Sequence, residues 1–314
     1  MGGHVRLRLI AALIIAVFTQ LSPVSAARYA SIIVDEKSGA VLHAVNPDWR
    51  GYPASLTKMM TLYLVFEKLK SGKIKLGTRL KVSRRAAKRP KSKIYVKRGS
   101  TITVQQGIKA LVTKSANDVA TVIAEGLGGT EEKFARMMTY RARQLGMSRT
   151  TFKNASGLPN KKQVSTARDM ARLSIALRRD FPKRFKYFTT TEFRYRGRTH
   201  GNHNKLLRRL PGTDGIKTGY IRDSGFNIAV SVKYKRRRLI GAVFGGKSGN
   251  KRDTHAITLF KRVFKMLDEM DKSDRRRYIA GKNGGLPVTF AGLSPAQKAK
   301  RKAAIKRKKA KKKV

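Results

Sequence analysis

Cysteine is absent from the 314-residue sequence, so disulfide bridges, thiolate catalysis and cysteine-ligated metal sites are excluded. Acidic residues are scarce, because 18 Asp and Glu stand against 72 Lys and Arg, and the net charge is +54. A positive field of this strength favours binding to polyanions. Composition alone therefore indicates a nucleic-acid-binding protein.

Long apolar runs are also few, and the clearest one lies near the amino terminus. Arg6 and Arg8 precede the apolar residues 9–18, and the small residues Val24-Ser25-Ala26 follow. This layout is typical of a secretory signal peptide, and the run is too short to span a bilayer. We predict that residues 1–26 are cleaved and that the protein is exported to the periplasm or the outer face of the cytoplasmic membrane. An uncleaved amino-terminal anchor is the alternative.

Apolar patterns predict strands at both ends of the next part of the chain, with helices between them. One β-hairpin is predicted over residues 28–45 and a second over residues 225–244. Helices are predicted over residues 56–70, 104–127, 131–145, 166–177 and 253–270. Residues 27–271 are therefore expected to form an α+β domain, in which an antiparallel sheet formed from both ends packs against a helical cluster.

The composition changes after residue 271, and residues 272–314 form a basic low-complexity tail. Residues 294–314 contain eleven basic residues and no acidic one. Such a segment has too little apolar surface to offset its ordering entropy, so we expect it to be disordered. In an exported protein, we expect this tail to contact anionic envelope surfaces, with about 1 kcal/mol from each basic residue near them.

The chain is organised around Pro53-Ala-Ser-Leu-Thr-Lys58, at the start of the first predicted helix. Proline suits a first helical turn, because its φ is fixed and its missing N–H is not needed there. Ser55 and Lys58 are three residues apart and share one face of this turn. The helix is apolar on most sides, so the hydroxyl and the amine are expected in a hydrophobic core. Such a pair can supply a nucleophile and its base without histidine.

Two further short motifs follow. Ser115-Ala-Asn117 lies at the start of, or between, helices of the second helical block, and Lys217-Thr-Gly219 lies just before the late hairpin. Ser248-Gly-Asn-Lys251 has the spacing of the first two motifs, but it is placed in a Gly-rich loop and begins no apolar helix. The three other motifs, in this order and context, are stronger evidence than any one of them. A simple helix cap is the alternative for Ser115 and Asn117.

With Asn202-His-Asn-Lys-Leu-Leu207 and Asp214-Gly-Ile-Lys217, these motifs resemble penicillin-binding proteins of the D-alanyl-D-alanine carboxypeptidase type. This is the peptidase S11 family of the serine β-lactamase and transpeptidase superfamily, and the resemblance covers roughly residues 30–267. The family commonly has glycine where Ala116 stands. Many relatives carry a β-rich second domain with a membrane anchor, where this chain has its basic tail.

The resemblance implies a hydrolase that removes the terminal D-alanine from peptidoglycan stem peptides. Ser55 would attack the carbonyl of the D-Ala-D-Ala bond and form an acyl-enzyme that water hydrolyses. Lys58 would accept the proton as a neutral amine, which requires a pKa about 3 units below the ordinary ~10.4. Burial and the charge of Lys217 act in that direction. Ser115 would relay a proton to the leaving amine, and Asn117 would hold Lys58 and the substrate amide.

The resemblance also implies how the substrate is bound. Lys217 and the hydroxyl of Thr218 would receive the terminal carboxylate, and Gly219 would let the strand backbone approach closely. The backbone N–H groups of Ser55 and Tyr220 would form the oxyanion hole. β-Lactam antibiotics would act as covalent inhibitors.

Two other functions remain as alternatives. One is a DD-endopeptidase that cuts peptidoglycan cross-links with the same residues, and the other is a catalytically inactive, basic envelope-binding protein. A class A β-lactamase is disfavoured, because no Glu-x-x-x-Asn lies between Asn117 and Lys217. No cofactor is expected, and no metal, since His200 and His203 have no carboxylate or cysteine beside them. The export signal and the three motifs argue against a nucleic-acid partner.

Overall fold

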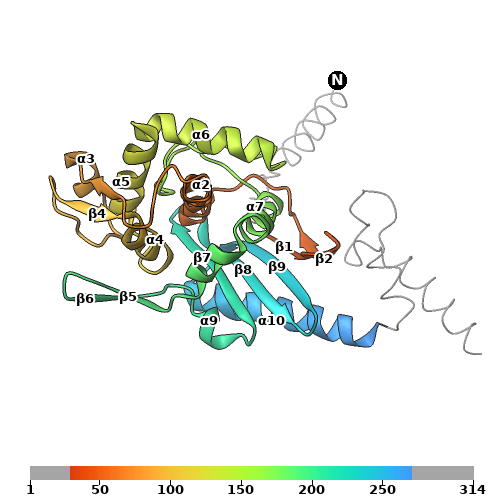
Figure 1. Cartoon of the computed structure of the whole chain (residues 1–314). Helices are drawn as coiled ribbons and strands as arrows, with labels where there is room; N and C mark the ends of the chain where they lie inside the picture. The colour runs from red at the N-terminus through yellow and green to blue at the C-terminus, as the bar shows by residue number, and fades with distance from the viewer. Residues whose placement is uncertain (1–28, 271–314) are drawn as a thin grey trace, which may run out of the picture.

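Strands from both ends of the described chain form one five-stranded antiparallel sheet (Figure 1). The computed structural model describes residues 29–270, and the strand order is β2-β1-β9-β8-β7. The strands are β1 (Ala30–Asp35), β2 (Val41–Val45), β7 (Thr213–Ile221), β8 (Gly225–Tyr234) and β9 (Arg237–Gly246). The first strand pairs with the last, with Ile32 opposite Ala242. The predicted α+β fold, with its sheet formed from both ends, is confirmed.

A long helix covers each face of this sheet. Ile32 and Val34 of β1 belong to the larger core, which includes α7 (Ala167–Asp180), whereas Ile33 belongs to the smaller core with α10 (Gly249–Glu269). This division follows from the strand geometry, because successive side chains point to opposite faces. In Figure 1, α10 runs below the sheet and the helical cluster lies above it.

The helical cluster is built around α2 (Lys58–Lys70), most of whose side chains are buried. It packs against α4 (Val104–Val112), α5 (Asn117–Gly128), α6 (Glu131–Gln144) and α7. The central position agrees with a sequence that is apolar on most sides. The remaining short elements are η1 (Ala54–Thr57), β3 (Arg79–Lys81), α3 (Arg84–Ala87), β4 (Thr101–Thr103), α8 (Pro182–Phe185), η2 (Lys186–Thr189), β5 (Glu192–Tyr195), β6 (Arg198–Gly201) and α9 (Leu206–Arg209).

The structure corrects the sequence-based boundaries in three places. The helical block predicted over residues 104–127 consists of two helices, α4 and α5, with a break at residues 113–116, so the second motif lies between helices. Residues 213–221 form the strand β7, so the late hairpin is part of a three-stranded meander. The closing helix begins at Gly249 rather than at residue 253, because the hydroxyl of Ser248 accepts a hydrogen bond from the Lys251 N–H at 3.1 Å.

The predicted signal peptide, residues 1–26, and the basic tail, residues 272–314, lie outside the described residues. Among the helices of residues 29–270, none combines the length and the apolarity that a membrane span requires.

Candidate active site

Ser55 and Lys58 lie together where the chain enters α2. Ser55 is in the 3₁₀ turn η1, which follows Pro53, and Lys58 is the first residue of α2. The Lys58 Nζ donates a hydrogen bond to the Ser55 Oγ at 3.0 Å. Lys58 is fully buried, whereas Ser55 lines a cleft. The pair therefore places a hydroxyl at the surface of the cleft and an amine in the core behind it.

Two other oxygen atoms accept hydrogen bonds from the Lys58 amine. The Asn117 Oδ1 accepts one at 2.8 Å, and the Ser156 carbonyl accepts another. Burial holds the pKa of Lys58 well below its ordinary value, and the charge of Lys217 lowers this pKa further, while Asp118 opposes the shift. This environment favours the neutral form of the Lys58 amine.

The Ser156 carbonyl comes from the loop that follows Phe152. The Asn154 Oδ1 accepts hydrogen bonds from the Ser156 N–H at 3.2 Å and the Gly157 N–H at 2.7 Å, which closes a tight turn. Gly157 has φ +85°, and a Cβ there would lie 1.9 Å from the Ala54 carbonyl oxygen. The sequence indicates a turn at this place, but it gives no signal that the turn presents a carbonyl to Lys58.

Ser115 lies in the break between α4 and α5, and Asn117 is the first residue of α5. The Asn117 side chain donates to the Pro90 carbonyl at 3.1 Å, which turns its oxygen toward Lys58. Ser115 is buried with φ 58°, and its Oγ has no hydrogen-bond partner within residues 29–270. The N-cap residue of α5 is Ala116, which offers no side-chain cap, so the capping alternative for Ser115 and Asn117 is wrong.

The third motif lies on β7, beside Ser55. A Cβ on Gly219 would lie 3.0 Å from both the Pro53 carbonyl oxygen and the Ser55 nitrogen, so the strand approaches η1 closely. Lys217 is buried, and its Nζ donates to the Thr218 carbonyl at 3.0 Å. Burial and the nearby charge of Arg252 lower the pKa of Lys217 to about 7.

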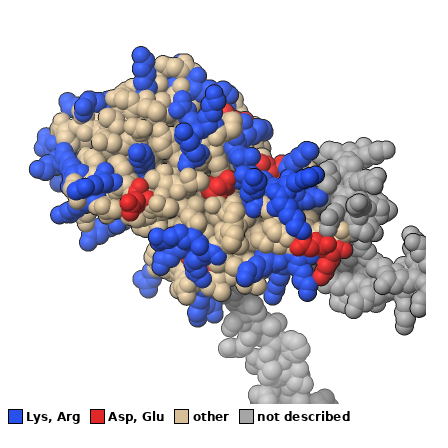
Figure 2. Space-filling view, turned by 60° about the horizontal axis from the view of Figure 1, so that its bottom comes forward, with Lys and Arg blue, Asp and Glu red and all other residues tan. Residues whose placement is uncertain are grey.

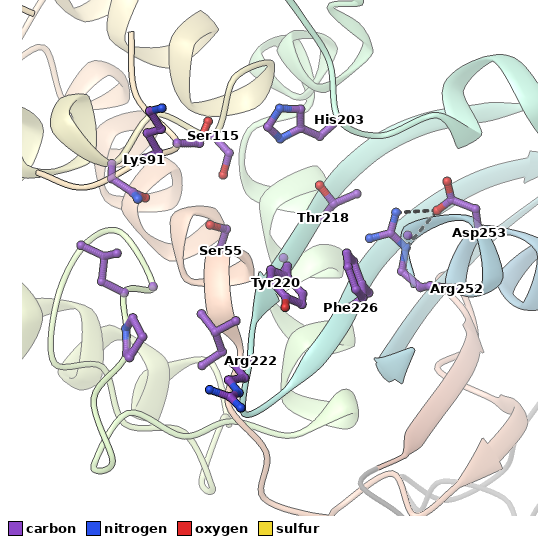
Figure 3. Close-up of a pocket in the computed structure, with 18 of the residues that line it drawn as sticks. Ser55, Lys91, Ser115, His203, Thr218, Tyr220, Arg222, Phe226, Arg252 and Asp253 are labelled. Atoms are coloured by element: carbon purple, nitrogen blue, oxygen red, sulfur yellow. Dashed lines mark hydrogen bonds and ion pairs between the residues drawn. The ribbon is translucent and has the colours of Figure 1, made fainter. Parts of the chain in front are cut away.

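The three motifs surround one cleft of about 570 Å³ between the sheet and the helical cluster. Figure 3 shows Ser55, Ser115 and Thr218 at this opening, with Tyr220 below them. Of the predicted site residues, those that line the cleft are Ser55, Ser115, Asn117, Thr218, Gly219 and Tyr220. The two lysines, Lys58 and Lys217, are buried and are not part of its lining.

The cleft also contains residues that the sequence did not indicate as site residues. Arg252 enters it from the first turns of α10, where it donates to the Asn227 carbonyl at 3.0 Å and to Asp253 at 2.6 Å. Its position depends on α10 packing beside β8, so no local sequence signal marks it. His203 also lines the cleft, and desolvation by neighbouring groups together with the charge of Lys217 lowers the pKa of this imidazole, although the side chain is exposed. Within residues 29–270, no group of three or more possible ligands is arranged to hold a metal ion.

A serine and a buried lysine at the start of a central helix, beside an edge strand of an antiparallel sheet, define the class of transpeptidase-like serine proteins. Comparison with known proteins identifies the family within this class. The family model of peptidase S11, D-alanyl-D-alanine carboxypeptidase, matches residues 17–248, and the chain belongs to this family.

Individual relatives agree with this assignment. The chain is 34% identical over 255 residues to the D-alanyl-D-alanine carboxypeptidase DacF of Bacillus subtilis, an alignment that covers 80% of this chain and 65% of the relative. Its structure is similar to that of penicillin binding protein 5 from Haemophilus influenzae, with a TM-score of 0.72 and 32% identity over 74% of this chain and 69% of the other. Penicillin-Binding Protein D2 from Listeria monocytogenes, solved in an ampicillin-bound form, gives a TM-score of 0.66 and 29% identity over 73% of this chain and 95% of the other.

Proposed function

We propose that the chain is a serine-type D-Ala-D-Ala carboxypeptidase, which removes the terminal D-alanine from peptidoglycan stem peptides. The observation that carries this proposal is the buried Lys58 amine within hydrogen-bond distance of the Ser55 Oγ. Membership of the S11 family supplies the substrate class. The chain spans 65% of the length of its Bacillus relative, so the activity of that protein supports the proposal without establishing it.

Acylation follows from the contacts of Lys58. A neutral amine has two N–H bonds, which the Asn117 Oδ1 and the Ser156 carbonyl can accept. The contact with Ser55 then reverses its direction, and the Ser55 hydroxyl donates to the lone pair of the Lys58 Nζ. As the Ser55 Oγ bonds to the scissile carbonyl carbon, its proton passes to the Lys58 Nζ. The C–N bond then breaks, and the leaving amine receives a proton through the buried Ser115 hydroxyl. Water hydrolyses the acyl-enzyme and restores Ser55.

The substrate is positioned by β7 and by the first turns of α10. The Thr218 hydroxyl and the Arg252 guanidinium receive the terminal carboxylate, and the charge of Lys217 adds to the positive field there. The Ser55 N–H is in the first turn of η1, where it has no carbonyl acceptor within the helix. Together with the Tyr220 N–H, it is suited to bind the developing oxyanion.

β-Lactams are proposed to acylate the same serine. Support comes from the ampicillin-bound form of the similar Listeria protein. Because peptidoglycan lies outside the cytoplasm, we place the enzyme in the cell envelope, in agreement with the export predicted from residues 1–26.

A labelling experiment tests this function. Labelled penicillin should form a covalent adduct with the full-length protein and none with Ser55→Ala. Labelling that is retained in Ser55→Ala would contradict the assignment of Ser55 as the nucleophile. A wild-type protein that is not labelled would favour the inactive envelope-binding alternative. Free D-alanine from a pentapeptide is the expected product, whereas monomers released from cross-linked dimers would favour the endopeptidase.

A further inference from the structure

Two arginines line opposite ends of the cleft (Figure 3). Arg252 lies beyond Thr218, where the proposed function places the terminal carboxylate. Arg222 lies beyond Tyr220 and is the first residue after the end of β7. Ser55 lies between these two ends, and the catalytic steps described above give Arg222 no role.

The path of the bound peptide follows from the proposed function, on which this inference rests. If the terminal carboxylate is at Thr218 and the scissile carbonyl is at Ser55, the acyl part of the peptide continues toward Arg222. β7 is an edge strand of the sheet, and such a strand can pair with an extended peptide. β7 ends at Ile221 and Arg222 is the first residue of the turn that follows, so the two residues from Tyr220 to Arg222 span at most roughly 7 Å. Arg222 is therefore opposite the first or second residue before the acylated D-alanine.

The acidic residue of the cleft lining lies away from Arg222. Among the described residues that line the cleft, Asp253 is the acidic one, and it lies at the other end. Its carboxylate accepts from Arg252 at 2.6 Å and lies 3.7 Å from Arg209. Lys91 and Lys205 also line the cleft, and Figure 3 shows Lys91 on the side of Ser115, at the opposite side of the view from Arg222.

We propose that Arg222 forms a second carboxylate-binding subsite, which favours stem peptides that carry a free carboxylate one or two residues before the acylated D-alanine. The planar guanidinium of arginine matches the two oxygens of a carboxylate. Because Arg222 is exposed, the pair is partly screened by water, and the expected preference is roughly threefold to fivefold.

The test compares two peptides that differ only in charge, acetyl-Glu-D-Ala-D-Ala and acetyl-Gln-D-Ala-D-Ala. The readout is the ratio of their kcat/KM values for D-alanine release by the full-length protein. The wild type should prefer the Glu peptide by roughly threefold to fivefold, and Arg222→Gln should bring the ratio close to one. Arg222→Lys should keep part of the preference, because it keeps the charge.

Arg208→Gln is the matched control, because Arg208 is exposed on α9 and does not line the cleft. It removes the same charge and should leave the ratio unchanged. If Arg208→Gln lost the preference for the Glu peptide to the same extent, the subsite would be contradicted. The preference would then come from the general positive field of the protein. A ratio near one in the wild type, or a preference that survives in Arg222→Gln, would also overturn it while D-alanine release continued. Failure to cleave either peptide, with no penicillin adduct, would overturn the proposed function and the subsite together.

Discussion

Among the described residues, no carboxylate is a hydrogen-bond partner of Lys58. Its amine faces a hydroxyl, an amide oxygen and a backbone carbonyl, and another buried lysine raises the cost of a positive charge there. Dipoles of this kind satisfy the N–H groups of a neutral amine without stabilising the cation as a carboxylate would. The basicity of Lys58 toward Ser55 is therefore set by its surroundings rather than by a single partner.

Removing this base should slow acylation while leaving the fold in place. In Lys58→Met, a side chain of similar length fills the buried site but cannot accept the Ser55 proton. The rate of penicillin adduct formation should fall by roughly 10²- to 10⁴-fold, the usual range for a general base. Lys70→Met, at the exposed end of the same helix, should keep the wild-type rate. If Lys58→Met formed the penicillin adduct at the wild-type rate and circular dichroism showed a folded protein, the role of Lys58 as proton acceptor would be contradicted.

The pKa of Lys217, about 7, predicts how substrate binding depends on pH. Below this pH Lys217 is a cation that attracts the terminal carboxylate, and above it the side chain becomes neutral. The KM for an acyl-D-Ala-D-Ala peptide should therefore rise as the pH increases through about 7. Protonation of Lys58 at a pH below its own lowered pKa should reduce kcat.

Lys217→Arg separates these two effects. An arginine keeps its charge across this range, so the rise in KM should occur at a higher pH in the variant. The pH below which kcat falls should not increase, because that fall comes from Lys58. Steady-state kinetics from pH 5 to pH 10 would check this, and an unchanged KM profile in the variant would rule out Lys217 as its source.

At the scale of elements, two glycines let neighbouring segments pack closely against the backbone of η1. Gly157 brings the loop with the Ser156 carbonyl onto the Ala54 backbone, and Gly219 brings β7 within reach of the Ser55 nitrogen. The break between α4 and α5 then places Ser115 and Asn117 opposite them. The site is thus assembled at the junction of four segments, none of which contains it alone.

A methyl group at Gly157 should disturb this junction. In Gly157→Ala the new Cβ would overlap the Ala54 carbonyl, and the positive φ adds a cost of about 1–2 kcal/mol. Gly72→Ala is a matched control, since Gly72 has φ +72° but nothing within 4 Å of its Cβ position. In thermal unfolding, each kcal/mol of destabilisation should lower Tm by about 2–4 °C. The decrease in Tm should be larger for Gly157→Ala than for Gly72→Ala. The penicillin-labelling rate should fall only in Gly157→Ala, and equal effects of the two variants would contradict the role of this contact.

At the scale of the whole molecule, charge is the dominant property. Lys and Arg are spread over the face shown in Figure 2, where Asp and Glu are few. Several carboxylates are already paired inside the fold, as Asp35 is with Arg237 and Asp253 with Arg252. The remaining positive charge is available to an anionic surface.

We predict that the basic tail holds the protein to such a surface. Deletion of residues 294–314 should release the protein from anionic lipid vesicles at physiological salt, because each basic residue near the surface contributes about 1 kcal/mol. A tail of the same length with Gln at every basic position should behave like the deletion. Vesicle co-sedimentation measures this, and binding equal to that of the full-length protein would show that the folded domain is sufficient.

The sequence by itself determined the fold class, the central helix and the three motifs. It could do so because apolar periodicity and the order of the motifs are read directly along the chain, and Ser55 and Lys58 are separated by a single helical turn. Only the tertiary structure decided that β7 is a full strand, that the Ser156 carbonyl faces Lys58, and that Arg252 enters the cleft. These features arise from contacts between segments far apart in the chain, such as Lys58 with Ser156, and neither residue alone carries a signal of the other.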